Sequence, residues 1–268
     1  MGKNLGISPG VSPTDTFDLS IDQWHQRFTN QASWSKDLRK YLFQKCELAP
    51  GDRILEVGSG TGAVINQLVN EIKRFITGVD IDHDGLSFSQ HINPESFHVQ
   101  ADGHILPFAD QTFTVSLCHF LLLWVKNPIQ VLYEMSRVTN PGGCIMALAE
   151  PDHQARIDYP PPLDQLGQQQ TRALKKQGAD IAMGRQINRL FNQIGLEKIE
   201  AGIISAQWTR SPGLTADETE WLMLRSDLAG EITADELTEY RELDAEAREN
   251  GERILYIPTF YAIGFVPK

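Results

Sequence analysis

Short apolar runs alternate with amphipathic stretches from Arg53 onward, and this alternation constrains the fold more than any other feature. Each run has the length of a buried strand, and the stretch 62–72 carries apolar residues at helical spacing. Such alternation implies right-handed crossovers and a parallel sheet. The predicted strands cover 53–57, 75–80, 96–100, 113–119 and 143–149, with a loop at 101–112 and a helix at 131–143.

Two more strands are expected in the second half of the chain, at 196–207 and 253–266, where they could close the sheet as an antiparallel pair. Helices are predicted at 184–194, 216–229 and 234–249, and the last two open with capping boxes at 215–218 and 233–236. The predicted fold class is therefore α/β: a doubly wound, mostly parallel seven-stranded sheet with an N-terminal helical arm and a helical insertion before the last strand.

Charge is unevenly distributed along these 268 residues. The net charge is −11, and the segment 214–250 alone holds 12 acidic and 3 basic residues. A phosphate backbone would be repelled from such a surface, so we expect no nucleic-acid partner. The alternative interpretation is an ordinary solvated helix face.

Other features exclude some classes of protein. The three cysteines, Cys46, Cys118 and Cys144, have no paired spacing and no histidine at ligand spacing, so we expect reduced thiols and no metal site. Residues 1–17 lack the apolar centre of a secretory signal. The longest apolar run, 120–125, is too short to cross a bilayer. We therefore expect a cytoplasmic protein without membrane insertion.

A glycine-rich loop follows the first predicted strand and precedes a helix. Its sequence is Glu56-Val-Gly58-Ser-Gly60-Thr-Gly62. Glycines allow a sharp turn and leave room for a ligand against the backbone N–H groups, and the helix N-terminus adds partial positive charge. The loop alone is a weak signal, because it also fits the loose dinucleotide pattern.

Two carboxylates narrow the interpretation. Asp80 ends the second strand, 18 residues after Gly62, where a carboxylate can accept hydrogen bonds from both hydroxyls of a ribose. Asp102 follows the third strand and could accept from an adenine amino group, while Gly103 lets the loop approach the ring. A tight Pro-Gly-Gly turn then leads into the fifth strand at Gly143.

The segments ILEVGSGTG, GVDID, ADGHILPFADQTF and LYEMSRVTNPGG occur in this order within 49–150. Together they resemble class I S-adenosylmethionine-dependent methyltransferases, and most closely the group that includes the ubiquinone/menaquinone C-methyltransferases. The resemblance implies S-adenosylmethionine as cofactor. It implies a core at 49–150 that binds the cofactor, preceded by a tail and helical arm at 1–48 and followed by an acceptor-side segment at 151–268.

The resemblance also assigns cofactor contacts. Glu56 would order the glycine loop and face the methionine amino group, Asp80 would hold the ribose, and Asp102 would bind the adenine amino group. The full set of implied cofactor-binding residues is Glu56, Gly58, Ser59, Gly60, Thr61, Gly62, Asp80, Ile81, Ala101, Asp102, Gly103, Cys118 and His119.

The catalytic residues are not identified by the sequence. His119 and His153 are candidates, at the ends of the fourth and fifth strands, and both could equally be structural. A base is needed only if the acceptor must lose a proton. Two positions depart from the family pattern: Thr114 replaces a usual aspartate, and Trp124 a frequent histidine, which leaves the acceptor chemistry open.

The sequence therefore predicts methyl transfer to a small organic acceptor, for which an aromatic compound and a quinone precursor are the candidates. Methylation at carbon, at oxygen and at nitrogen all remain open. The alternatives are a non-catalytic cofactor-binding protein and, with less support, an NAD-dependent oxidoreductase. We expect the segment 214–250 to form a helical lid, with its apolar faces packed on the sheet edge above strands four and five. The sequence does not indicate the oligomeric state.

Overall fold

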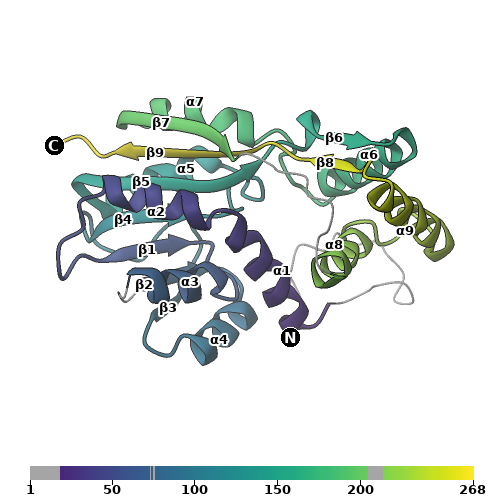
Figure 1. Cartoon of the computed structure of the whole chain (residues 1–268). Coiled ribbons are helices and arrows are strands. Elements are labelled where there is room, and N and C mark those ends of the chain that lie inside the picture. The colour runs from purple at the N-terminus through teal and green to yellow at the C-terminus, as the bar shows by residue number, and fades with distance from the viewer. Residues whose placement is uncertain (1–18, 73, 75, 205–213) are drawn as a thin grey trace. The chain divides into compact units, whose positions relative to one another are not determined.

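The computed structural model of this chain describes residues 19–72, 74, 76–204 and 214–268 (Figure 1). In chain order its elements are α1 (Ile21–Trp34), α2 (Lys36–Lys45), β1 (Ile54–Val57), α3 (Ala63–Ile72), β2 (Ile76–Asp80), α4 (His83–Ile92), β3 (Phe97–Gln100), β4 (Phe113–Cys118), α5 (Pro128–Val138), β5 (Thr139–Pro151), η1 (His153–Ala155), β6 (Ile157–Tyr159), α6 (Pro161–Lys176), η2 (Gly184–Gln186), α7 (Ile187–Gln193), β7 (Glu197–Ile204), α8 (Leu214–Asp227), α9 (Ala234–Glu249), β8 (Ile254–Tyr256) and β9 (Thr259–Phe265).

Seven of the strands form one sheet, in the order β3-β2-β1-β4-β5-β9-β7. The first five pair in parallel, and β9 runs antiparallel to both β5 and β7. This confirms the predicted doubly wound, mostly parallel seven-stranded sheet. The order of the strands reverses between β1 and β4, and ligands of open α/β sheets bind beside the carboxyl ends of the strands at such a switch point.

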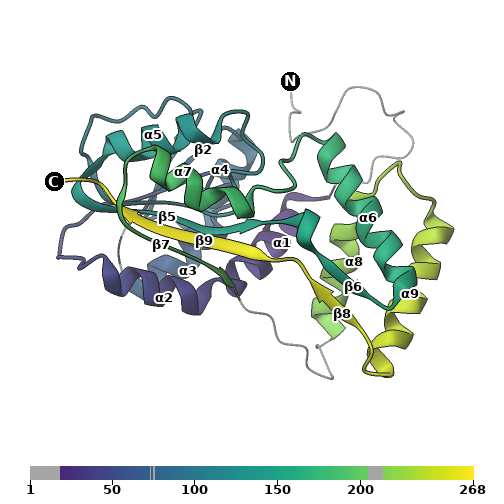
Figure 2. The ribbon, with the colours of Figure 1, turned by 90° about the horizontal axis from the view of Figure 1, so that it is seen from above.

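Helices cover both faces of this sheet. Figure 2 shows α5 and α7 on one face and α2 and α3 on the other. All four residues of β1 are buried, as a strand covered on both faces requires. The apolar side of α3 joins the core through Val64, Ile65 and Leu68. The core therefore holds the carboxyl ends of β1, β2 and β4 in fixed register.

Some predicted boundaries were wrong. The predicted helix 131–143 ends at Val138, and the next residue, Thr139, is already extended, because the turn Asn-Pro-Gly-Gly cannot continue a helix. The single strand predicted at 253–266 is two strands, β8 and β9, which belong to different sheets and are interrupted at Pro258. The sequence analysis also missed α6 and the small antiparallel sheet of β6 and β8.

The chain divides into two compact units, which we treat separately. The sheet unit comprises Ile21–Pro151, Met183–Ile204 and Thr259–Lys268, and so includes the predicted helical arm. The helical unit comprises Met1–Ser20, Asp152–Ala182 and Ser205–Pro258. The predicted functional division at 48/49 and 150/151 stays a prediction.

The helical unit has a hydrophobic core of its own. Trp221, Leu224 and Leu228 of α8 pack with Leu163 and Leu166 of α6, and α9 contributes Ala247. We expected these faces to pack on the sheet edge. The structure adds α6, which the sequence analysis did not include, as a packing partner of these faces. The lid over the sheet edge stays a prediction.

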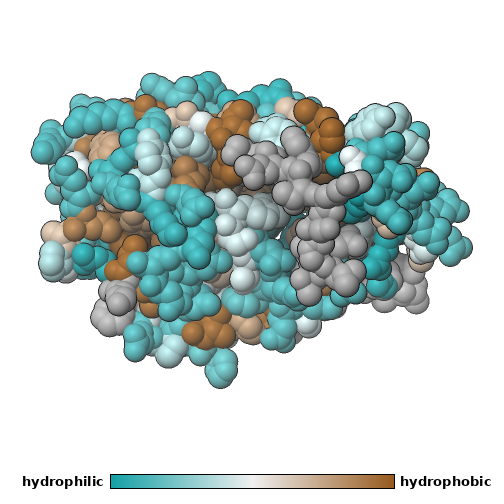
Figure 3. All heavy atoms as spheres, viewed as in Figure 1, coloured by the Kyte–Doolittle hydropathy of each residue, from teal (hydrophilic) through white to brown (hydrophobic). Residues whose placement is uncertain are grey.

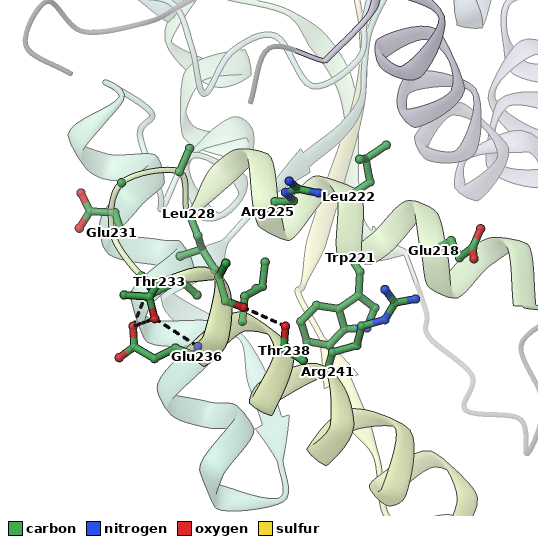
Figure 4. A pocket seen from close by; sticks show the side chains of 15 residues that line it. Glu218, Trp221, Leu222, Arg225, Leu228, Glu231, Thr233, Glu236, Thr238 and Arg241 are labelled. Atoms are coloured by element: carbon green, nitrogen blue, oxygen red, sulfur yellow. Dashed lines mark hydrogen bonds between the residues drawn. The ribbon is translucent and has the colours of Figure 1, made fainter. Parts of the chain in front are cut away.

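A pocket of about 880 Å³ lies between α8 and α9 (Figure 4), with Trp221 and Leu228 among its lining residues. The capping box of α9 stands beside it. The Thr233 hydroxyl accepts from the Glu236 amide, and the Glu236 carboxylate accepts from the Thr233 amide. This confirms the predicted box at 233–236, whereas the box predicted at 215–218 includes side chains outside the described residues.

Two of the three cysteines are joined. Cys46, which ends α2, and Cys144 of β5 form a disulfide, with their Cα atoms 6.1 Å apart. The prediction of three reduced thiols was therefore wrong. The two cysteines are 98 residues apart in the sequence, and their spacing does not indicate that α2 packs beside β5. Cys118 is the buried free thiol.

The surface carries both polar and apolar side chains. The face in Figure 3 is largely hydrophilic, with scattered apolar groups between hydrophilic ones. No helix in the described part of the chain has the length and apolar character needed to span a membrane. In the same part, no cluster of three or more His, Cys, Asp or Glu side chains is arranged to hold a metal ion.

Candidate functional site

The glycine loop leaves the carboxyl end of β1 and leads into α3. The backbone N–H groups of Gly58 and Ser59 both donate to the Val79 carbonyl, at 2.8 and 3.0 Å, which ties the loop to β2. Gly58 has a φ of +77°, and a Cβ added there would lie 2.7 Å from Leu121 Cδ1. Only glycine fits this position without strain, because it combines a left-handed conformation with a close approach.

Glu56 lies beneath this loop, in the middle of the sheet, and is 2% exposed. Burial raises its pKa well above the ordinary value, although the charge of Arg39 opposes the shift. Among the described residues, neither Glu56 Oε2 nor Ser59 Oγ has a hydrogen-bond partner. Buried acceptors of this kind are normally satisfied, so two beside one glycine loop fit a ligand that donates hydrogen bonds, such as an amino group.

Asp80 ends β2 next to the glycine loop. Its Oδ2 accepts from the Gly60 amide at 2.7 Å, and its Oδ1 accepts from the Asp82 amide at 2.9 Å. Burial raises the pKa of Asp80, and these two hydrogen bonds oppose the rise. Each oxygen retains a further lone pair that could accept from a ligand hydroxyl. Ile81, the next residue, is 67% exposed, which leaves an apolar surface beside the carboxylate.

Asp102 occupies the loop after β3. The preceding residue, Ala101, donates its N–H to the Asp80 carbonyl at 2.9 Å. This hydrogen bond holds the backbone before Asp102 beside Asp80. The backbone N–H of His104 and its Nδ1 both bond Asp102 Oδ1, and these contacts lower the pKa of Asp102. A Cβ on Gly103 would lie 3.1 Å from Val57 Cγ1. The loop therefore lies close to the end of β1, and its approach to an adenine ring stays a prediction.

Cys118 and His119 stand at the end of β4. Cys118 pairs with Val57 across the parallel ladder, and burial raises the pKa of its thiol. His119 Nε2 lies 3.2 Å from the Ser35 hydroxyl. Burial, and then the charge of Arg39, lower the pKa of His119 to about 3. The imidazole is therefore neutral at physiological pH and poorly suited to serve as a general base there.

The N-terminal arm contributes residues that the sequence analysis missed. His25 of α1 bonds the Thr61 hydroxyl at 2.9 Å, and a Cβ at Gly60 would be 3.7 Å from the Phe28 ring. Arg39 of α2 is fully buried, donates to Ser35 Oγ and pairs with Glu71 at 3.2 Å. No spacing in the sequence relates this arm to the glycine loop, so only the fold could identify these contacts.

Glu150 was also missed as a site residue. It ends β5, is fully buried, and accepts backbone hydrogen bonds from the turn that follows β4. The sequence did carry a signal, because an acidic residue directly after the apolar run of a central strand requires an explanation.

The predicted site residues are divided between the two units. The predicted cofactor-binding residues lie at the carboxyl ends of β1 to β4, all within the sheet unit. His153 lies in η1 of the helical unit, where it is buried, and its catalytic role stays a prediction. Of the two departures from the family pattern, Thr114 bonds Asp52 Oδ1 at 2.8 Å, and Trp124 is 44% exposed.

The sheet order, the glycine loop and the acidic residues that end β2 and follow β3 define a nucleotide-type cofactor site on a class I methyltransferase fold. Comparison with known proteins specifies this further. Residues 55–147 match the model of the methyltransferase domain family, and the fold of this part of the chain is that of class I, S-adenosylmethionine-dependent methyltransferases.

Curated relatives match less than half of the chain. A demethylmenaquinone methyltransferase of Corynebacterium urealyticum is 34% identical over 123 residues, which are 46% of this chain and 50% of the relative. A phosphatidylethanolamine N-methyltransferase of Cereibacter sphaeroides is 32% identical over 118 residues, or 42% of this chain and 56% of the relative. The chain thus spans about half the length of these relatives.

Solved structures share the fold at lower identity. Phosphoethanolamine N-methyltransferase 2 of Haemonchus contortus, bound to phosphomonomethylethanolamine and S-adenosylhomocysteine, has a TM-score of 0.61 at 14% identity. The match covers 97% of this chain and 62% of that one. The [4+2]-cyclase SpnF has a TM-score of 0.56 at 17% identity, covering 87% of this chain and 81% of that one. The fold therefore also occurs in a protein named for a different reaction.

Proposed function

We propose that this protein transfers a methyl group from S-adenosylmethionine to a small organic acceptor. The observation that carries this proposal is the unpartnered Oε2 of buried Glu56, which lies beneath a glycine loop whose neighbour, Asp80, has free acceptor capacity. An amino group and a ribose diol on one ligand would satisfy both. NAD also has a ribose, but it has no amino acid part to complement Glu56.

In the proposed mechanism, S-adenosylmethionine supplies, when bound, a methyl group activated by a positively charged sulfur. The residues of the chain bind and orient the reactants. Glu56 would hold the amino group, Asp80 the ribose hydroxyls, and Asp102 the adenine amino group, with Ile81 against the ring. Alignment of donor and acceptor can supply about 7–11 kcal/mol of the barrier.

His119 would serve as a hydrogen-bond partner near the reacting groups. Its low pKa keeps the imidazole neutral beside Arg39. A neutral imidazole can orient an acceptor group without carrying charge toward the positive sulfur. A proton released by the acceptor would then leave by another route, and the atom that is methylated, carbon, oxygen or nitrogen, stays open.

The acceptor that we propose is an apolar or aromatic small molecule. The exposed Trp34 packs edge-on against Phe120, which in turn contacts the His119 ring, so aromatic surface adjoins the end of β4. The relatives named for demethylmenaquinone methylation agree with a quinone-like acceptor. The lid role of 214–250, the exclusion of nucleic acid and the cytoplasmic location stay predictions.

A second candidate is a protein that binds the cofactor without transferring the methyl group. The similarity of the fold to a protein named as a [4+2]-cyclase supports this alternative. Release of S-adenosylhomocysteine separates the two. The purified protein is incubated with S-adenosylmethionine and a panel of quinols, phenols and amines. Acceptor-dependent release supports methyl transfer, whereas tight cofactor binding without release on any acceptor or on cell extract supports the second candidate.

A further inference from the structure

The chain turns sharply directly after β4, over residues 120–124. Phe120 has a φ of +52°, and its N–H donates to the Ala149 carbonyl of β5 at 3.0 Å. The next three amides converge on one side chain. Leu121 and Leu122 donate to Glu150 Oε1 at 3.0 and 2.9 Å, and Leu123 donates to Oε2 at 3.2 Å. A single carboxylate therefore fixes three consecutive residues of this turn.

Holding the turn with the buried carboxyl group of Glu150 has a free-energy cost. It is fully buried, and the partners of both oxygens are backbone amides of this one turn. Burying a carboxylate without an adjacent cation carries a large desolvation cost, which hydrogen bonds offset only in part. An apolar residue at this position would stabilise the core more simply. Costly buried groups of this kind concentrate at functional sites.

The turn contacts two parts of the candidate site. On one side, Leu121 packs so tightly against the glycine loop that a Cβ at Gly58 would lie 2.7 Å from its Cδ1. On the other side, the Phe120 ring lies edge-on against His119, with the centroids 4.9 Å apart. Movement of this turn would therefore shift both the wall of the cofactor loop and the neighbour of His119.

We propose that Glu150 is a positioning residue for methyl transfer: its carboxylate holds the turn 120–124 in the conformation that sets Leu121 against the glycine loop and Phe120 against His119. The effect of Glu150 on methyl transfer rests on the proposed function. Its effect on the conformation of the turn does not. Glu150 itself touches neither reactant and acts through the turn.

The test compares Glu150→Gln with Glu134→Gln. The first variant keeps the shape of the side chain, but its amide nitrogen would face N–H donors. The second is a control for loss of charge, because Glu134 also accepts a backbone N–H, from Leu106 at 2.8 Å, and in addition pairs with Arg137 at 2.8 Å. Three readouts are measured: amide hydrogen exchange, the Kd for S-adenosylhomocysteine, and turnover on an acceptor found by the release assay.

For Glu150→Gln we expect exchange of the Leu121, Leu122 and Leu123 amides to be at least tenfold faster and the Kd for S-adenosylhomocysteine to rise, because Leu121 is no longer held against the glycine loop. Turnover at saturating substrates should fall at least tenfold. The control should change none of the three. Unchanged exchange in the turn, or faster exchange with full turnover, would overturn the inference.

A second variant protects the test against misfolding. Leu121→Ala leaves the carboxylate and its amide donors in place and removes the side chain that approaches Gly58. We expect it to fold, to keep its exchange protection at 122–123 and to lose at least fivefold in turnover. Full turnover would count against the inference. If no acceptor is ever found, the proposed function fails, while exchange still decides whether Glu150 holds the turn.

Discussion

The two units differ in the partners of their buried carboxyl groups. In the sheet unit, Glu150 is bonded by backbone amides alone among the described residues, and Glu56, which feels the charge of Arg39, has one oxygen without a hydrogen-bond partner among them. In the helical unit, Asp158 and Asp244 are bridged by arginines: Arg253 bonds both, Arg156 bonds Asp158, and Arg248 bonds Asp244. The helical network is internally satisfied, whereas the sheet unit retains acceptor capacity for a ligand. At the glycine loop, the unsatisfied oxygen of Glu56 therefore leaves an acceptor for a ligand, whereas the arginine network of the helical unit is structural.

The largest effect is expected in the helical unit. Asp244→Ala should reduce the free energy of unfolding by about 3–5 kcal/mol, because it leaves the largely buried Arg253 without one of its two carboxylates. Urea denaturation followed by circular dichroism measures the change. A loss below about 1 kcal/mol would mean that the arginine network contributes little, and the contrast between the units would disappear.

A pH effect is expected in the sheet unit. Burial raises the pKa of Glu150 to about 7, although three amide donors oppose the shift. The folded state therefore holds this proton more tightly than the unfolded state, whose ordinary carboxyl titrates near 4.5. The contribution of Glu150 to stability is full below pH 4.5 and is lost as the pH rises to about 7, by roughly 3 kcal/mol.

The measurement for Glu150 is the unfolding free energy of wild type minus that of Glu150→Gln, taken at intervals from pH 4.5 to 8. Subtraction removes the other titrating groups. We expect the difference to fall across this window and to level off above it. A difference that is constant with pH would show that the carboxyl titrates in its ordinary range.

The cofactor site should respond to Asp80→Ala by losing affinity rather than stability. The substitution removes an acceptor for the ribose hydroxyls, and each charge-assisted hydrogen bond is worth about 1.5–3 kcal/mol. The Kd for S-adenosylhomocysteine should rise at least tenfold, while circular dichroism stays unchanged. Asp84→Ala, an exposed acid on α4, is the control and should bind normally. Equal affinity in both variants would place the ribose elsewhere.

The smallest effect is expected at the surface of the helical unit. Lys176 pairs with Glu231 at 2.6 Å, but its side chain is 66% exposed. Solvent screens such pairs, so Lys176→Ala should change the unfolding free energy by less than about 1 kcal/mol. The same denaturation experiment checks this value, and a loss as large as that of Asp244→Ala would contradict the distinction between buried and exposed pairs.

Residues close in sequence to a strand end were predictable. The glycine loop, Asp80 and Asp102 follow strands whose apolar runs are evident, and parallel strands bring their carboxyl ends to one edge. Contacts between distant segments were not. Nothing local relates His25 to Thr61, Arg39 to Glu71 or Cys46 to Cys144, because each pair depends on how the arm packs on the sheet unit.

The helical unit shows a second limit of local patterns. The helices α8 and α9 were predicted close to their observed bounds, since capping and periodicity are local signals. Their packing partner was not predicted, because α6 begins with two prolines shortly after the strand β6 and was not recognised as a helix. The periodicity of an amphipathic helix predicts that one of its faces is buried. It does not identify the surface that covers this face.

The most direct test of the central claim is calorimetric titration of the purified protein with S-adenosylhomocysteine, S-adenosylmethionine and NAD. The partnerless oxygen of Glu56 beneath the glycine loop predicts that both sulfur-containing ligands bind at one site per chain and that Glu56→Gln weakens both. NAD should show no measurable heat of binding. Tight binding of NAD, with no response to either sulfur-containing ligand, would contradict the account.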